Sequence, residues 1–132
     1  MAIRNLLLAL ALFPITAFAV GIESVTLLTD DKGEAGAAVE AFVPSDLVQH
    51  FDIKLDATEA GNHNFLVEFW AVSTTAGDNL KVTEFKTNSL VTNTLNAKVS
   101  LPRDWPAGHY RLDVKMDGTM IGTHKYDVTE AE

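Results

Sequence analysis

The C-terminal third of the chain contains the pattern that most constrains the fold. Apolar and polar side chains alternate through residues 109–116, which is the period of a β-strand with one buried and one solvent-facing side. Asp117-Gly118 follows at once, and residues 120–128 form a second strand-like run. An Asp-Gly pair between two such runs is typical of a tight hairpin turn, because glycine accepts positive φ without strain. We therefore predict a closing β-hairpin, whose core-facing residues begin with Tyr110, Leu112, Val114 and Met116.

The first 19 residues have the layout of a secretory signal peptide. A basic residue comes first, residues 6–13 form a short apolar run, and Ala17-Phe18-Ala19 is a small-x-small cleavage site. The alternative is a membrane anchor. However, the apolar run is shorter than the roughly 20 residues that a spanning helix needs, and Pro14 interrupts it. We predict cleavage after Ala19, one domain at 20–132 and no stable membrane insertion after cleavage.

Charge and cysteine content exclude several functions. The sequence has 18 acidic and 10 basic residues, so its net charge is −8, and loss of Arg4 with the signal peptide makes it −9. Such an acidic surface repels phosphate backbones and anionic lipids, so nucleic acid and membrane surfaces are not expected partners. The absence of cysteine excludes thiol catalysis and disulfides, so an apolar core must hold the domain. Together with the signal peptide, these features predict a periplasmic location, with secretion beyond the envelope as the alternative.

The rest of the chain has the pattern of short β-strands separated by turns. No run of ten or more residues with helical periodicity occurs after the signal peptide. Strands at roughly ten-residue spacing instead predict an all-β sandwich. Residues 29–33 and 86–89 have the composition of turns. The strands expected before the closing hairpin are residues 22–28, 37–43, 47–55, 65–72, 80–85 and 90–101.

Residues 65–72 form a nearly continuous apolar run whose core-facing side is ambiguous. If Phe69 faces the core, Trp70 shares the outer face with Glu68. If Trp70 faces the core, Glu68 also points inward unless a β-bulge resets the alternation. The sequence leaves both arrangements open.

Several of these features resemble an exported bacterial immunoglobulin-like domain. Trp70 lies in the third main strand, where such domains often bury a tryptophan, and residues 110–112 resemble a tyrosine corner. Residues 105–110 are similar to the W-x-x-G-x-Y entry to the penultimate strand in such modules, and residues 42–46 are similar to their entry to the second strand. The resemblance implies a single immunoglobulin-like β-sandwich of seven to eight antiparallel strands. It covers nearly all of 20–132 and implies a fold without a particular function.

No constellation for catalysis, metal binding or cofactor binding stands out. The four histidines lack metal-site spacing, and nucleophile-elbow, phosphate-loop and dinucleotide motifs do not occur. Scattered surface histidines are the preferred interpretation, although His109 and Arg111 share one outward face and His50 lies outward on another strand. His124 shares the parity of Tyr126, so we expect it to be partly buried. We predict no enzyme, no metal and no cofactor.

Trp105 lies in a loop at one end of the predicted sandwich. Loop aromatics on a rigid scaffold are frequent binding anchors, but a large aromatic near a strand end also packs readily against the core, here beside Tyr110. The candidate binding residues are therefore Trp105, His109 and Arg111.

These observations predict a non-enzymatic periplasmic binding or accessory module. Its partner would be another envelope protein, contacted through an exposed sheet face or by strand addition at an edge. One alternative is an inhibitor or immunity protein that blocks an enzyme with a protruding acidic loop, at residues 30–34 or 57–64. Another is a carrier of a small ligand or metal, which requires a concave pocket with convergent histidine or tryptophan side chains. The oligomeric state stays open.

Overall fold

The computed structural model describes residues 20–56, 62–90 and 94–130. The signal peptide predicted at 1–19 lies outside these residues. The described chain is made of β-strands, and it contains no helix long and apolar enough to cross a membrane. The strands are β1 (Ile22–Asp31), β2 (Glu34–Val39), β3 (Val48–Leu55), β4 (Asn62–Thr74), β5 (Gly77–Leu90), β6 (Thr94–Ser100), β7 (Gly108–Met116) and β8 (Thr119–Val128).

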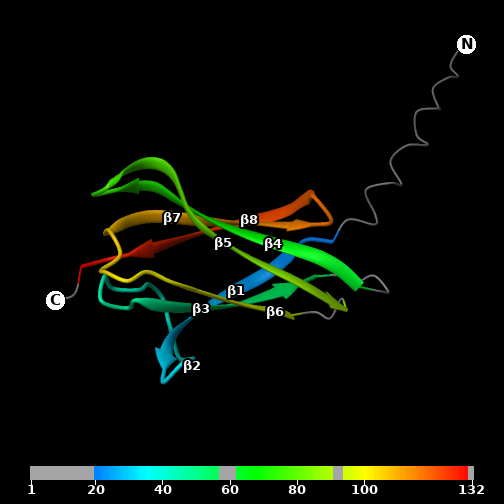
Figure 1. The fold of residues 1–132 in the computed structure, drawn as a ribbon, viewed down its shortest axis with the longest axis horizontal. Helices are drawn as coiled ribbons and strands as arrows, with labels where there is room; N and C mark the ends of the chain where they lie inside the picture. The colour runs from blue at the N-terminus through cyan, green and yellow to red at the C-terminus, as the bar shows by residue number, and fades with distance from the viewer. Residues whose placement is uncertain (1–19, 57–61, 91–93, 131–132) are drawn as a thin grey trace, which may run out of the picture.

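The strands form two four-stranded sheets that pack face to face (Figure 1). One sheet has the order β2-β1-β3-β6 and the other the order β5-β4-β7-β8, with antiparallel pairing throughout. β7 and β8 form the predicted closing hairpin. Its turn residues Asp117 and Gly118 both have positive φ, 51° and 86°, as a tight hairpin requires. The predicted antiparallel sandwich is therefore confirmed, with eight strands in the described residues.

The core between the sheets is rich in aromatic side chains. Tyr110 and Leu112 of β7 are buried, as the alternation predicts. The hydroxyl of Tyr110 donates a 2.6 Å hydrogen bond to the carbonyl of Pro106, which confirms the tyrosine corner. Edge-to-face, tilted and stacked ring contacts connect the two sheets and the loop before β7. The rings in this network are Phe42, Phe51, Phe69, Trp105, Tyr110 and Tyr126.

The alternation along β4 resolves the ambiguity at its centre. Phe69 is buried in the core, whereas Glu68 and Trp70 lie on the outer face of the sheet. The register between β4 and β5 shifts between Phe69 and Trp70, but the inward and outward alternation of β4 continues across the shift. Of the two arrangements that the sequence left open, the structure has Phe69 in the core and Trp70 outside it, unlike the domains that bury a tryptophan in this strand.

Some strand ends differ from the prediction. β5 continues through 86–89, so the turn predicted there is wrong: pairing with β4 supplies main-chain hydrogen bonds that override a polar composition. β1 continues to Asp31, and β2 precedes and overlaps the strand predicted at 37–43. Before β3, Leu47 is exposed rather than inward, whereas Gln49 is fully buried on the core side, as its parity indicates.

Candidate functional site

The structure separates the three predicted binding residues. Trp105 is 1% exposed, and its indole N–H donates a 3.0 Å hydrogen bond to the carbonyl of Leu47. It caps the core beside Tyr110, so it is not available as an exposed binding anchor. His109 and Arg111 lie on the outer face of β7, where the side chain of His109 is 72% exposed. Only the last two therefore belong to a surface that a partner can reach.

The histidines do not converge on a common site. His50 lies on the outer face of the sheet β2-β1-β3-β6, on the opposite side of the sandwich from His109, but it is only 7% exposed beside Asp30, so the expectation of a surface histidine is wrong for this residue. No group of three or more His, Cys, Asp or Glu in the described part of the chain is placed to hold a metal ion. Burial lowers the pKa of His124, which is partly buried as expected. The other three histidines lie beside separate aspartates, in the pairs His50–Asp30, His63–Asp117 and His109–Asp127.

The outer face of the sheet β5-β4-β7-β8 carries a dense set of charged side chains, which we name the charged face. It holds five of the ten basic residues of the sequence but four of its eighteen acidic residues. The face therefore carries a slight excess of positive charge, and most of the acidic residues lie elsewhere in the chain. The basic residues are Lys81, Lys86, Arg111, Lys115 and Lys125, and the acidic residues are Glu68, Glu84, Asp113 and Asp127.

Two carboxylates on neighbouring strands organise this face. Glu68 of β4 lies directly opposite Glu84 of β5, an arrangement that would be repulsive without counter-ions. Lys81 lies 2.6 Å from Glu84 and 3.3 Å from Glu68, so one ammonium group bridges both. The hydrogen bond between Lys81 and Glu84 raises the pKa of Lys81 and lowers that of Glu84. The other ion pairs of these two carboxylates are longer, at 3.4 Å for Lys86–Glu84 and 3.6 Å for Lys115–Glu68.

An aromatic and cationic pair occupies the centre of the charged face. The guanidinium carbon of Arg111 lies 5.0 Å from the ring centroid of Trp70, within cation–π range. The side chain of Asp113 is 7% exposed, and its carboxylate accepts hydrogen bonds from Arg111 Nε at 3.1 Å and Thr123 Oγ1 at 2.7 Å. These contacts fix the position of the Arg111 side chain on the charged face.

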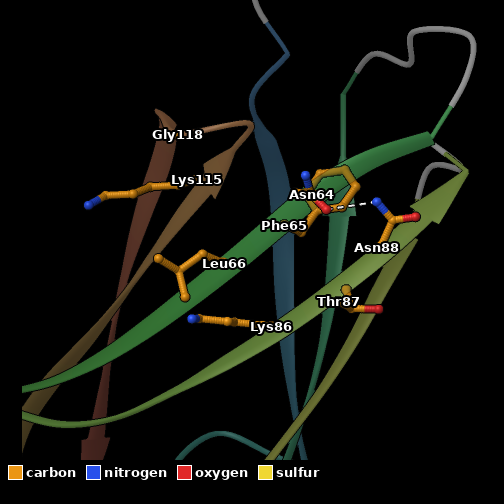
Figure 2. A pocket seen from close by; sticks show the side chains of 8 residues that line it. All are labelled: Asn64, Phe65, Leu66, Lys86, Thr87, Asn88, Lys115 and Gly118. Carbon is orange, nitrogen blue, oxygen red and sulfur yellow. Dashed lines mark hydrogen bonds between the residues drawn. The ribbon is translucent and has the colours of Figure 1, made fainter.

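A groove of about 450 Å³ lies where the charged face meets the β7–β8 turn. Figure 2 shows Leu66 of β4 between the side chains of Lys86 from β5 and Lys115 from β7. At one end, Asn88 Nδ2 donates a 2.7 Å hydrogen bond to Asn64 Oδ1 (Figure 2). Sequence reasoning did not single out these residues. Their outward parity was visible, but the strand order that brings them together was not.

The β1–β2 hairpin extends from the lower side of the sandwich (Figure 1). β2 is the edge strand of its sheet, and residues 35–39 have no charged side chain. The acidic loop predicted at 30–34 is a tight turn with positive φ at Lys32 and Gly33. The Asp30 carboxylate accepts hydrogen bonds from His50 and the Gly33 N–H, in that order of effect, and both lower its pKa. The other predicted acidic loop lies largely outside the described residues.

Two packed antiparallel sheets closed by a tyrosine corner define an immunoglobulin-like β-sandwich. Among solved structures, the chain is similar to an immunoglobulin-like protein from Pseudomonas aeruginosa, with 17% identity, a TM-score of 0.50, and coverage of 83% of this chain and 95% of that one. A second similarity is to a Pseudomonas fluorescens alkylpurine DNA glycosylase bound to DNA, with 12% identity, a TM-score of 0.43, and coverage of 83% and 30%. No protein-family model and no curated protein matches the chain. The fold class is therefore confirmed as immunoglobulin-like.

Proposed function

We propose that this protein is an exported, non-enzymatic immunoglobulin-like module that binds another protein of the cell envelope by strand addition at β2. The proposal extends the fold assignment to a function, which fold alone does not specify. The observation that carries it is the uncharged edge of β2 at residues 35–39. An edge strand presents unpaired N–H and C=O groups, which an extended segment of a partner can pair with.

The other three sheet edges are protected by known devices. β5 is irregular in its pairing with β4 and carries Lys81 and Lys86. One end of β8 is covered by the segment around Phe42, which exchanges main-chain hydrogen bonds with residues 127 and 129. β6 carries Lys98. Lysines and covering segments oppose edge-to-edge association, and within the described chain β2 has neither, although its pairing with β1 is also irregular, between Leu28 and Asp30.

Charge at the ends of β2 argues against pairing with a second copy. Glu34 begins the strand and Glu40 follows it. In an antiparallel pair of two β2 strands centred on Ala37, Glu34 of each copy would lie opposite Glu40 of the other, and like charges directly opposite are destabilising. A partner strand with Lys or Arg at both ends would instead find complementary charges. We therefore infer a different protein as the partner.

Capture experiments with matched lysine variants test this function. The wild-type protein is immobilised and exposed to an envelope extract of its source cells, and bound proteins are quantified by mass spectrometry. Ala37→Lys places a charge in the β2 edge, and we expect the specifically captured partner to fall at least tenfold. Ser100→Lys adds the same charge to an exposed position of β6 and should capture as wild type does. Equal capture by Ala37→Lys and wild type, or no specific capture by wild type, contradicts the proposal.

A further inference from the structure

The charged face presents positive charge although the protein as a whole is strongly acidic. Two of its four carboxylates are recessed: the side chain of Glu68 is 13% exposed and that of Asp113 is 7% exposed, whereas those of Glu84 and Asp127 are 33% and 48% exposed. The side chain of Lys86, by contrast, is 73% exposed. Near the groove, an approaching molecule therefore meets the ammonium group of Lys86 before it meets the recessed carboxylate of Glu68. Because the remaining surface is acidic, an anionic partner is steered towards this face and repelled elsewhere.

The groove concentrates this character at one place. Among the described residues that line it, Lys86 and Lys115 are charged and none is acidic. Both lysines make long ion pairs: Lys86 lies 3.4 Å from the carboxylate of Glu84, and Lys115 lies 3.6 Å from that of Glu68. Each ammonium group has three N–H donors, so both can also bind another carboxylate. Between them, Leu66 supplies an apolar floor (Figure 2).

The asparagines at the end of the groove add main-chain recognition. The hydrogen bond from Asn88 Nδ2 to Asn64 Oδ1 fixes both amide planes. It leaves the Asn64 NH₂ group as a donor and the Asn88 carbonyl oxygen as an acceptor. One donor and one acceptor side by side match the C=O and N–H groups of an extended peptide. Asn64 is itself anchored, because its main-chain N–H donates to the Asp117 carboxylate at 2.9 Å.

We propose that this groove binds an extended acidic segment of a partner protein. A carboxylate side chain lies between Lys86 and Lys115, a neighbouring apolar side chain lies on Leu66, and the peptide main chain bonds the Asn64–Asn88 amides. The groove is open along the sheet surface, which suits a peptide that crosses it. This site uses residues on the sheet opposite β2, so it is a second contact and does not depend on strand addition.

Fluorescence anisotropy with labelled synthetic peptides tests the site. The probes are three short peptides in which leucine alternates with glutamate, glutamine or lysine. We expect the purified protein to bind the glutamate peptide at least tenfold more tightly than the glutamine peptide and to show no binding of the lysine peptide. Added salt should weaken the glutamate complex, because both charges lie near solvent.

Two double variants with equal charge separate a specific groove from general electrostatics. Lys86→Gln with Lys115→Gln should weaken the glutamate peptide at least tenfold. Lys54→Gln with Lys98→Gln removes the same charge from the opposite sheet and should change affinity less than twofold. Circular dichroism checks that both variants fold, and Ala37→Lys should bind the peptide as wild type does. Equal loss in both double variants, no preference for glutamate over glutamine, or binding of phosphatidylglycerol vesicles without binding of the peptide would overturn the proposal.

Discussion

The two tyrosines of the core offer a matched test of how hydrogen bonding stabilises this sandwich. Tyr110 and Tyr126 stack with ring centroids 5.6 Å apart, and both are buried. They differ at the hydroxyl. That of Tyr110 donates to the Pro106 carbonyl at 2.6 Å, whereas that of Tyr126 is buried without a hydrogen-bond partner among the described residues. Phenylalanine substitution at each position removes one oxygen and leaves the stacked ring.

We expect the two substitutions to change the free energy of unfolding in different directions. Tyr110→Phe loses a hydrogen bond and leaves the Pro106 carbonyl to find another donor. Because Pro106 is only half-buried and can regain water, we expect a loss of about 1–1.5 kcal/mol. Tyr126→Phe removes a desolvated hydroxyl that has no compensating bond, so we expect no loss and a gain of up to about 1 kcal/mol. The two variants should therefore differ by roughly 2 kcal/mol, or several degrees in melting temperature.

Urea unfolding followed by tryptophan fluorescence measures the difference, with circular dichroism as a second probe. The ring of Trp105 contacts Tyr110, so its emission should report loss of the core. The dependence of the unfolding free energy on urea should be the same in wild type and both variants, which shows that the midpoint shift reflects stability. If Tyr126→Phe is destabilised as much as Tyr110→Phe, the Tyr126 hydroxyl has a partner and the reasoning fails.

Two further predictions concern the backbone and alkaline pH. Gly108→Ala should cost more than about 3 kcal/mol in urea unfolding, because the added Cβ would clash with the Ser73 carbonyl oxygen at a φ of 146°. Gly118→Ala, with a φ of 86° and open space around its Cβ, should cost about 1 kcal/mol, and equal losses in the two variants would contradict the clash. Burial raises the pKa of Tyr110 to about 12 and also raises that of Tyr126. The unfolded chain releases both protons near pH 10 while the folded chain keeps them, so stability should fall as pH rises above about 10; phenolate absorbance appearing near pH 10 in folded protein would refute this.

Local patterns were sufficient to predict the strands in which apolar and polar side chains alternate strictly. The closing hairpin follows from strict alternation and an Asp-Gly turn, and the tyrosine corner was expected from the resemblance to immunoglobulin-like domains; both occur as predicted. The centre of β4 could not be assigned, because an apolar run has no polar residue to mark its outer side except Glu68. The turn predicted at 86–89 failed for the opposite reason: an exposed edge strand is polar, and its pairing with β4 is invisible in a local window.

The candidate surfaces depend on strand order, which the sequence pattern did not supply. Lys86 and Lys115 are 29 positions apart in the numbering and flank Leu66 only because β4 lies between β5 and β7. The uncharged run at residues 35–39 was visible, but its position at a sheet edge was not. The alternative roles left open for Trp105 likewise required the packing of the loop against the carbonyl of Leu47.

The same alternation that builds the core also fixes the geometry of the charged face. Each buried residue of β4, such as Phe69, has an outward neighbour, such as Glu68, so the outer side chains cannot shift along the strand without moving the core. Glu68 ties β4 to both neighbouring strands through Lys81 and Lys115. The groove is therefore held in place before any partner arrives, and binding need not repay the cost of ordering the strands. We accordingly expect mutations in the groove to change peptide affinity without changing the free energy of unfolding by more than about 0.5 kcal/mol. Tyr110→Phe should instead lower the free energy of unfolding and leave the groove able to bind the peptide.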